Sequence, residues 1–105
     1  MLANIYEIKA SNNLLFNEID IIFKNIPKCI ELEGYNNDGD IAYLSNIYII
    51  DSIYDIKKEL GELYDKFQSI YLLQTIEIDS LYYNNMYKLS LNYKNDGCAY
   101  RLYKL

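Results

Sequence analysis

The 105-residue sequence has no histidine, no tryptophan, one proline and two cysteines. Histidine is the usual general base near neutral pH and the commonest metal ligand, so its absence argues against acid–base catalysis and against a metal site. Cys29 and Cys98 form no CxxC pair and have no histidine to activate them, which disfavours a nucleophilic role. Two thiols in a reducing compartment are the preferred interpretation, and a single disulfide is the alternative.

Targeting and phosphate-binding motifs are also missing. Residues 1–7 contain neither a basic region nor a long apolar run, so we expect no signal peptide, no membrane contact and a cytoplasmic location. The sequence contains no GxGxxG and no GxxxxGK[ST] pattern, which excludes the common glycine-rich phosphate loops. We therefore predict no cofactor.

Basic residues are scarce. Fifteen acidic residues against ten basic ones give a net charge of −5 and a pI of about 4.6. Direct nucleic-acid binding needs clustered lysine and arginine, so we expect a basic protein partner or no charged partner. The abundance of Ile, Asn, Lys and Tyr, with a single Arg, suits an AT-rich coding sequence and suggests a low-GC bacterium or one of its phages.

About half of the residues are hydrophobic, which is enough for one folded domain spanning residues 1–105. The clearest amphipathic helix covers residues 52–70, with Ser52 as the expected N-cap and Asp55 as its capping-box partner. Its apolar stripe consists of Ile53, Ile56, Leu60, Leu63, Tyr64 and Phe67. Gly61 is unfavourable inside a helix, and close approach of the helix to a strand would explain it.

A second helix is predicted over residues 12–25, with Leu15, Ile19, Ile22, Phe23 and Ile26 on its apolar face. Polar and apolar residues also alternate along residues 18–22, so this part could instead be a strand. Pro27 ends this element.

Alternation of apolar and polar residues predicts strands at residues 5–10, 28–33, 41–50, 71–79, 87–93 and 98–103. Residues 41–50 are apolar on both faces, which is typical of a central strand. Leu72 and Leu73 could instead prolong the preceding helix. Residues 34–40 and 82–85 are predicted loops, and residues 94–97 a hairpin turn.

This order predicts an α+β fold in which two helices lie on one face of a mostly antiparallel sheet. The first six elements match a ferredoxin-like β-α-β-β-α-β arrangement, followed by a C-terminal β-hairpin. Apart from the repeated β-α-β order of the predicted elements, the sequence shows no evident internal repeat.

Two acidic patterns could carry chemistry, but each has a simpler interpretation. The EF-hand spacing places Gly34 and Ser45 at ligand positions that require carboxylates, so residues 36–40 are interpreted as a solvated loop. The pairs Glu31/Glu33 and Glu77/Asp79 each lie on one face of a predicted strand, as catalytic carboxylates of a glycosidase would. The polar face of a half-exposed sheet is the preferred explanation of both pairs. We predict no catalytic residue.

The thirteen tyrosines are the unusual feature of the composition. Tyr64, Tyr87 and Tyr93 are assigned to the core, and codon bias could explain the excess over phenylalanine. Tyrosine is also enriched at protein interfaces. The tyrosines expected to point outward are Tyr48, Tyr71, Tyr82, Tyr83 and Tyr103. The acidic residues expected around them are Glu7, Glu31, Glu33, Glu77 and Asp79.

The sequence therefore favours a small, acidic, non-catalytic protein that inhibits a basic, nucleic-acid-binding partner stoichiometrically. A phage anti-defence protein of the anti-CRISPR kind and a toxin-immunity protein both fit this class. The predicted partner-binding residues are Glu31, Glu33, Tyr48, Glu77, Asp79, Tyr82, Tyr83 and Tyr103. The alternative is a structural or regulatory subunit that self-associates, for instance as a homodimer, through its sheet edge or its tyrosine-rich face. RNA stacking on tyrosines is disfavoured because the basic residues and an RNP-like motif are missing.

Overall fold

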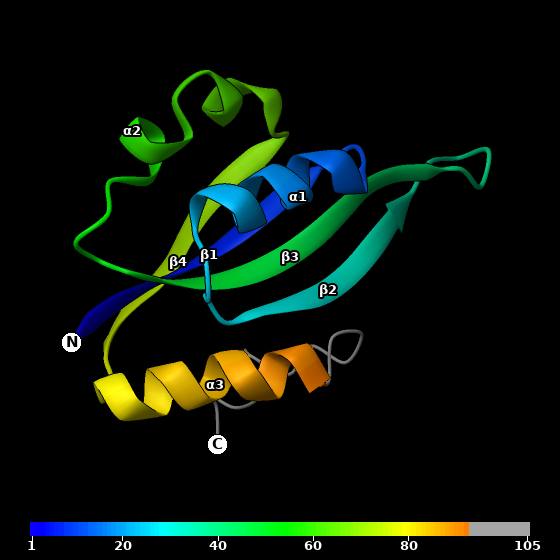
Figure 1. Ribbon diagram of the computed structural model, residues 1–105. Coiled ribbons are helices and arrows are strands. Elements are labelled where there is room, and N and C mark those ends of the chain that lie inside the picture. The colour runs from blue at the N-terminus through cyan, green and yellow to red at the C-terminus, as the bar shows by residue number, and fades with distance from the viewer. Residues whose placement is uncertain (93–105) are drawn as a thin grey trace.

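A four-stranded antiparallel sheet forms the centre of the protein (Figure 1). The computed structural model describes residues 1–92, except for the side chains of residues 29–33, 41 and 89–92. The strands are β1 (Leu2–Ala10), β2 (Lys28–Tyr35), β3 (Ile41–Asp51) and β4 (Ser69–Glu77). Their order in the sheet is β2-β3-β1-β4, and each pair of neighbours is antiparallel. The α+β class is thereby confirmed.

Helices cover both faces of this sheet. Helix α1 (Asn13–Ile22), helix α2 (Ile56–Leu60) and the 3-10 helix η1 (Gly61–Lys66) lie over one face (Figure 1). Helix α3 (Ser80–Asn92) lies across the other face (Figure 1). The two predicted helical segments lie on one face, as expected, but α3 covers the second face, which was expected to be free.

Each face has its own apolar core, because the central strands β1 and β3 carry apolar residues on both sides. On the α1 side, the rings of Phe16 and Tyr48 stand 6.2 Å apart between their centroids. On the α3 side, the buried cluster consists of Ala3, Ile5, Ile47, Ile49, Ile76, Ile78, Tyr83 and Met86. The predicted central position of the strand at residues 41–50 is confirmed.

Helix α3 corrects the prediction for residues 82–93. Asp79 begins the helix, because its carboxylate accepts hydrogen bonds from the backbone N–H groups of Leu81 and Tyr82. Tyr83 and Met86, three residues apart, are the buried residues that face the sheet. The predicted loop at 82–85 is wrong, and the predicted strand is wrong over residues 87–92, since Tyr83 and Met86 are spaced as on one face of a helix. The first strand of the predicted hairpin is therefore a helix, and the second, at 98–103, lies outside the described residues.

The segment predicted as one long helix is divided into three elements. Asp55, and not Ser52, is the N-cap of α2, and its carboxylate accepts from the N–H groups of Lys57 and Lys58. Gly61 ends the α-helix with φ +56°, a conformation that other residues rarely adopt. A Cβ at this glycine would meet nothing within 4 Å, so close packing is not the reason for glycine. Strand β4 already begins at Ser69.

The apolar stripe of that segment is largely correct. Ile56, Leu60 and Phe67 are buried, and Leu63 and Tyr64 pack partly buried against the same core. Ile53 is the exception with 77% of its surface exposed, because it lies in the turn before α2.

The first helix and its stripe are confirmed with shorter bounds. Asn12 caps α1 by accepting from the N–H of Leu14, and Ile19, Phe23 and Ile26 are buried. The loop predicted at residues 34–40 is confirmed with shorter bounds, because Gly34 and Tyr35 still belong to β2. The Asn36 side chain accepts from the N–H groups of Asp38 and Asp40, and Gly39 supplies a φ of +83°.

Candidate interaction surface

Two of the tyrosines predicted to face a partner are buried. Tyr48 is 0% exposed, and its hydroxyl oxygen accepts a hydrogen bond from the Asn46 side chain at 3.2 Å. Tyr83 is 8% exposed and donates its hydroxyl hydrogen to the carbonyl oxygen of Ile49. Burial raises the pKa of both phenols well above the usual range. Their predicted outward orientation is wrong, since helices cover both faces of the sheet.

Three predicted residues lie exposed near each other. The carboxylate of Glu77 is 75% exposed and stands 3.0 Å from the Met1 ammonium. Asp79 and Tyr82, at the start of α3, are also exposed. Tyr71, predicted to point outward, is 61% exposed on β4.

The remaining predicted residues do not join this group. Glu31 and Glu33 belong to β2, which is the opposite outer strand of the sheet, and their side chains are among those not described. Tyr103 lies outside the described residues. The described members of the predicted set are therefore not gathered on one face of the protein.

The turn after β3, the start of β1 and the start of α3 lie at the same end of the sheet, near the N label in Figure 1, and each of these segments carries exposed apolar side chains. Two backbone hydrogen bonds bring these segments together. The Ser52 N–H donates to the carbonyl of Leu2 at 2.9 Å, and the Ile78 N–H donates to the carbonyl of Met1 at 2.8 Å. We call this region the end surface, formed by Leu2, Ile53, Tyr54, Leu81 and Tyr82 with the carboxylates of Asp51, Glu77 and Asp79.

A repeated pentapeptide builds most of the end surface. Residues 50–54 read Ile-Asp-Ser-Ile-Tyr, and residues 78–82 read Ile-Asp-Ser-Leu-Tyr. In both copies the aspartate accepts from the N–H two residues later, Ile53 for Asp51 at 3.1 Å and Leu81 for Asp79 at 2.8 Å. The following apolar residue is exposed in each, 77% for Ile53 and 70% for Leu81.

The two copies flank the beginning of β1. Ala3 is paired with Asp51 on one side, and Leu2 with Glu77 on the other. Since neighbouring strands are about 4.8 Å apart, the copies leave the sheet roughly 10 Å from each other. Each therefore presents an apolar–tyrosine pair beside a carboxylate that the backbone holds in place.

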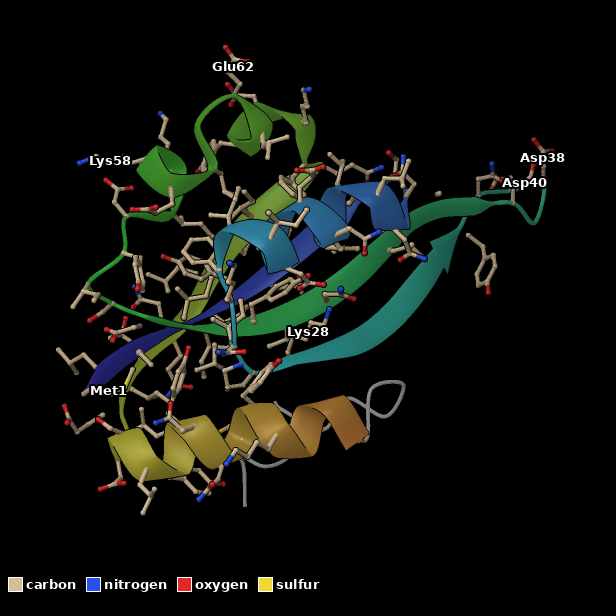
Figure 2. All side chains as sticks on the ribbon, in the orientation of Figure 1. Met1, Lys28, Asp38, Asp40, Lys58 and Glu62 are labelled. Atoms are coloured by element: carbon tan, nitrogen blue, oxygen red, sulfur yellow. The ribbon has the colours of Figure 1, made fainter. Side chains whose placement is uncertain are left out.

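The charge of the end surface is mostly negative. It carries three carboxylates, and one of them, Glu77, is paired with the Met1 ammonium. Lys57 lies over the ring of Tyr64 at 5.6 Å, and Lys58 lies on α2 away from Met1 (Figure 2). Asp51 adds to burial in raising the pKa of the Tyr83 phenol.

Sequence reasoning missed Leu2, Ile53, Tyr54 and Leu81. The signal that could have found three of them was the repeated pentapeptide, which is too short to stand out as a structural repeat. Its two copies also differ in structure, because the first forms a turn and the second begins a helix.

No group of three or more His, Cys, Asp or Glu side chains in the described part of the chain is arranged to hold a metal ion. Asp38 and Asp40 lie exposed at the tip of the β2–β3 hairpin, which extends away from the body of the protein (Figure 2). None of the described helices is both long and apolar enough to cross a bilayer.

No protein-family model, no curated protein and no solved structure matches this chain. A functional assignment therefore has to be based on the surface itself.

Proposed function

We propose that this chain is a non-catalytic binding protein that attaches to a basic protein partner through its end surface. The observation that supports this most directly is the pair of pentapeptides, which expose Ile53 and Leu81 on either side of β1 beside Asp51 and Asp79. Exposed apolar side chains grouped in this way are typical of protein-binding sites.

The composition of the end surface suits a protein partner. Interfaces combine a buried apolar and aromatic centre with a polar rim. Here Leu2, Ile53 and Leu81 would form the centre, and the three carboxylates would form the rim. The net charge of −5 would accelerate association with a basic partner and make it sensitive to salt.

The partner class that fits best is a nucleic-acid-binding enzyme with a cationic groove. An acidic protein in that groove would exclude the phosphate backbone in a one-to-one complex. A phage anti-defence protein of the anti-CRISPR kind and a toxin-immunity protein both act in this way, and an AT-rich coding sequence fits either source. A self-associating structural subunit is the second candidate, since the β4 edge is apolar and exposed.

We also propose that the first six elements have ferredoxin-like topology. This is supported by the strand order β2-β3-β1-β4 and by the position of α1 and α2 on the same face. Helix α3, on the opposite face, would be an addition to that arrangement.

The test compares two double variants. Ile53→Lys/Leu81→Lys replaces both apolar anchors and reverses the local charge. Leu14→Lys/Ile21→Lys makes the same change on α1, where those residues are 72% and 63% exposed. A partner recovered from extracts of the native host would be purified and titrated with each form by calorimetry.

The expected result is a one-to-one complex that the end-surface variant weakens by about 30-fold or more, while the α1 variant binds within about threefold of the wild type. The affinity of the wild type should fall as salt is added, and the partner should lose binding to nucleic acid. If both double variants weakened the affinity for the partner equally, the end surface would be excluded as the binding site. An acidic partner would exclude the proposed mechanism.

A further inference from the structure

We infer that a second copy of this chain pairs with the outer edge of β4, so that the two sheets join into one antiparallel sheet about a two-fold axis. The occupant differs from the proposed basic partner, and the residues are not those of the end surface. Either proposal can therefore fail without the other.

The two outer strands of the sheet differ in how they are protected. Strand β2 carries Lys28, Glu31 and Glu33 in its sequence, and its pairing with β3 is interrupted at two places. Charges and irregularities of this kind keep an outer strand from pairing with another chain. In β4 the charged side chain is Glu77 at its end, whereas residues 67–76 contain no charged side chain and no proline. The pairing of β4 with β1 shifts at one place, at Leu73.

Strand β4 exposes apolar side chains on both faces of the sheet. Tyr71 is 61% exposed and is paired with Glu7, while Leu72 is 54% exposed and is paired with Tyr6. Since neighbours along a strand point to opposite faces, Tyr71 lies on the α3 side and Leu72 on the α1 side. A strand added beside β4 would cover both, and an ordinary binding protein on one face would not.

The register of β4 limits how a second copy could pair. Pairing with β1 is regular from Ser69 to Leu72 and shifts at Leu73. A two-fold axis through Tyr71 uses the regular part, placing Tyr71 opposite its own copy and Ile70 opposite Leu72 of the second chain. Directly opposite residues then share a face, as antiparallel pairing requires.

Charge favours a second copy at this edge over other surfaces. Two chains of net charge −5 repel each other wherever acidic residues meet. In the register centred on Tyr71, residues 67–75 of the two chains oppose one another and all are uncharged, so the copies can approach along this segment without an acid–acid contact. Two-fold pairing is also self-complementary. Ile70 of each chain lies opposite Leu72 of the other, so the same apolar contact forms twice.

The first experiment measures mass by sedimentation equilibrium of the full-length chain, from low micromolar to near-millimolar concentration. We expect the mass to rise toward twice the 12.4 kDa of one chain. Tyr71→Lys and Leu72→Lys should each remain at one chain mass over the same range, because a lysine on an outer strand opposes pairing. Leu14→Lys, at a site 72% exposed on α1, should associate as the wild type does.

The second experiment tests the register directly. In a Cys29→Ser/Cys98→Ser background, Tyr71→Cys places one thiol opposite its copy, with Cα atoms about 5 Å apart, within the range that a disulfide spans. We expect an intermolecular disulfide on mild oxidation, and none for Leu14→Cys in the same background.

Three outcomes would overturn the inference. One is a wild-type protein whose measured mass stays at that of a single chain at every concentration. Another is a dimer that Leu14→Lys disrupts as readily as Tyr71→Lys. The last is a wild-type dimer in which Tyr71→Cys forms no intermolecular disulfide, since the contact would then lie elsewhere.

Discussion

The hydroxyl of Tyr83 on α3 donates a hydrogen bond to the carbonyl oxygen of Ile49 on β3, with 2.9 Å between the two oxygens. This bond and the buried side chain of Met86 fix α3 against the second face of the sheet. Because both faces are then covered, a partner can reach the sheet only at an end or along an edge.

Replacing Tyr83 with phenylalanine should lower the free energy of unfolding by about 1–2 kcal/mol. The substitution keeps the ring but leaves the Ile49 carbonyl without that donor in a buried position. Urea unfolding followed by circular dichroism measures the change. Tyr71→Phe, at a site 61% exposed, is the matched control and should change stability by less than about 0.5 kcal/mol.

Met86→Ala should cost about 2–4 kcal/mol, because Met86 is 0% exposed and its removal leaves a cavity between α3 and the sheet. Leu81→Ala on the same helix removes a side chain that is 70% exposed and should cost less than about 0.5 kcal/mol. Similar losses for the two variants in urea unfolding would contradict the packing of α3 described here.

Gly61→Ala should lower the free energy of unfolding by about 1–3 kcal/mol. Gly61 has φ +56° and ψ −125°, a backbone conformation that alanine adopts only with strain. Glu62→Ala, one residue later and exposed, serves as the control. If Gly61 lay inside a regular helix, the same substitution would instead stabilise the protein, so thermal unfolding distinguishes the two structures by sign.

Alkaline pH should destabilise the fold through its buried tyrosines. Burial raises the pKa of Tyr48, Tyr83 and Tyr6 above the ordinary value of 10.0. Their neutral forms therefore contribute stability that is complete below about pH 10 and is lost as the pH rises toward the pKa of the folded state.

Ultraviolet absorbance of tyrosinate measures this behaviour. In a titration of the folded protein, exposed tyrosines such as Tyr71 should ionise first, and the buried ones should ionise together with unfolding. In Tyr83→Phe, the loss of stability between about pH 10 and the unfolding transition should be smaller than in the wild type. An unchanged pH dependence in that variant would contradict the burial of Tyr83.

The parts of the fold that the sequence predicted well are those with one dominant periodicity. The strand around Ile47–Ile50 is apolar on both faces, and no helical stripe competes with that interpretation. The stripe of α1 likewise identifies Ile19, Phe23 and Ile26 as buried. The strand prediction was wrong over residues 87–92. Tyr87, Leu89 and Leu91 alternate as in a strand, while Tyr83 and Met86 are spaced as in a helix.

The candidate site was predicted only in part. Glu77, Asp79 and Tyr82 are exposed and lie close together in sequence, at the end of β4 and the start of α3. Tyr48 and Tyr83 are buried because a tyrosine in a strand or helix can face a core as readily as solvent. Which face of a sheet stays open depends on a helix distant in sequence, and local patterns do not contain that information.

The sequence alone determined the acidic charge, the absence of histidine chemistry, the α+β class and the central position of β3, since these follow from composition and short-range periodicity. Tertiary structure decided that α3 covers the second face, that β4 is an outer strand of the described sheet, and that the two pentapeptides flank the start of β1. Those features arise from contacts between segments far apart in the chain, where burial of apolar surface outweighs local preference.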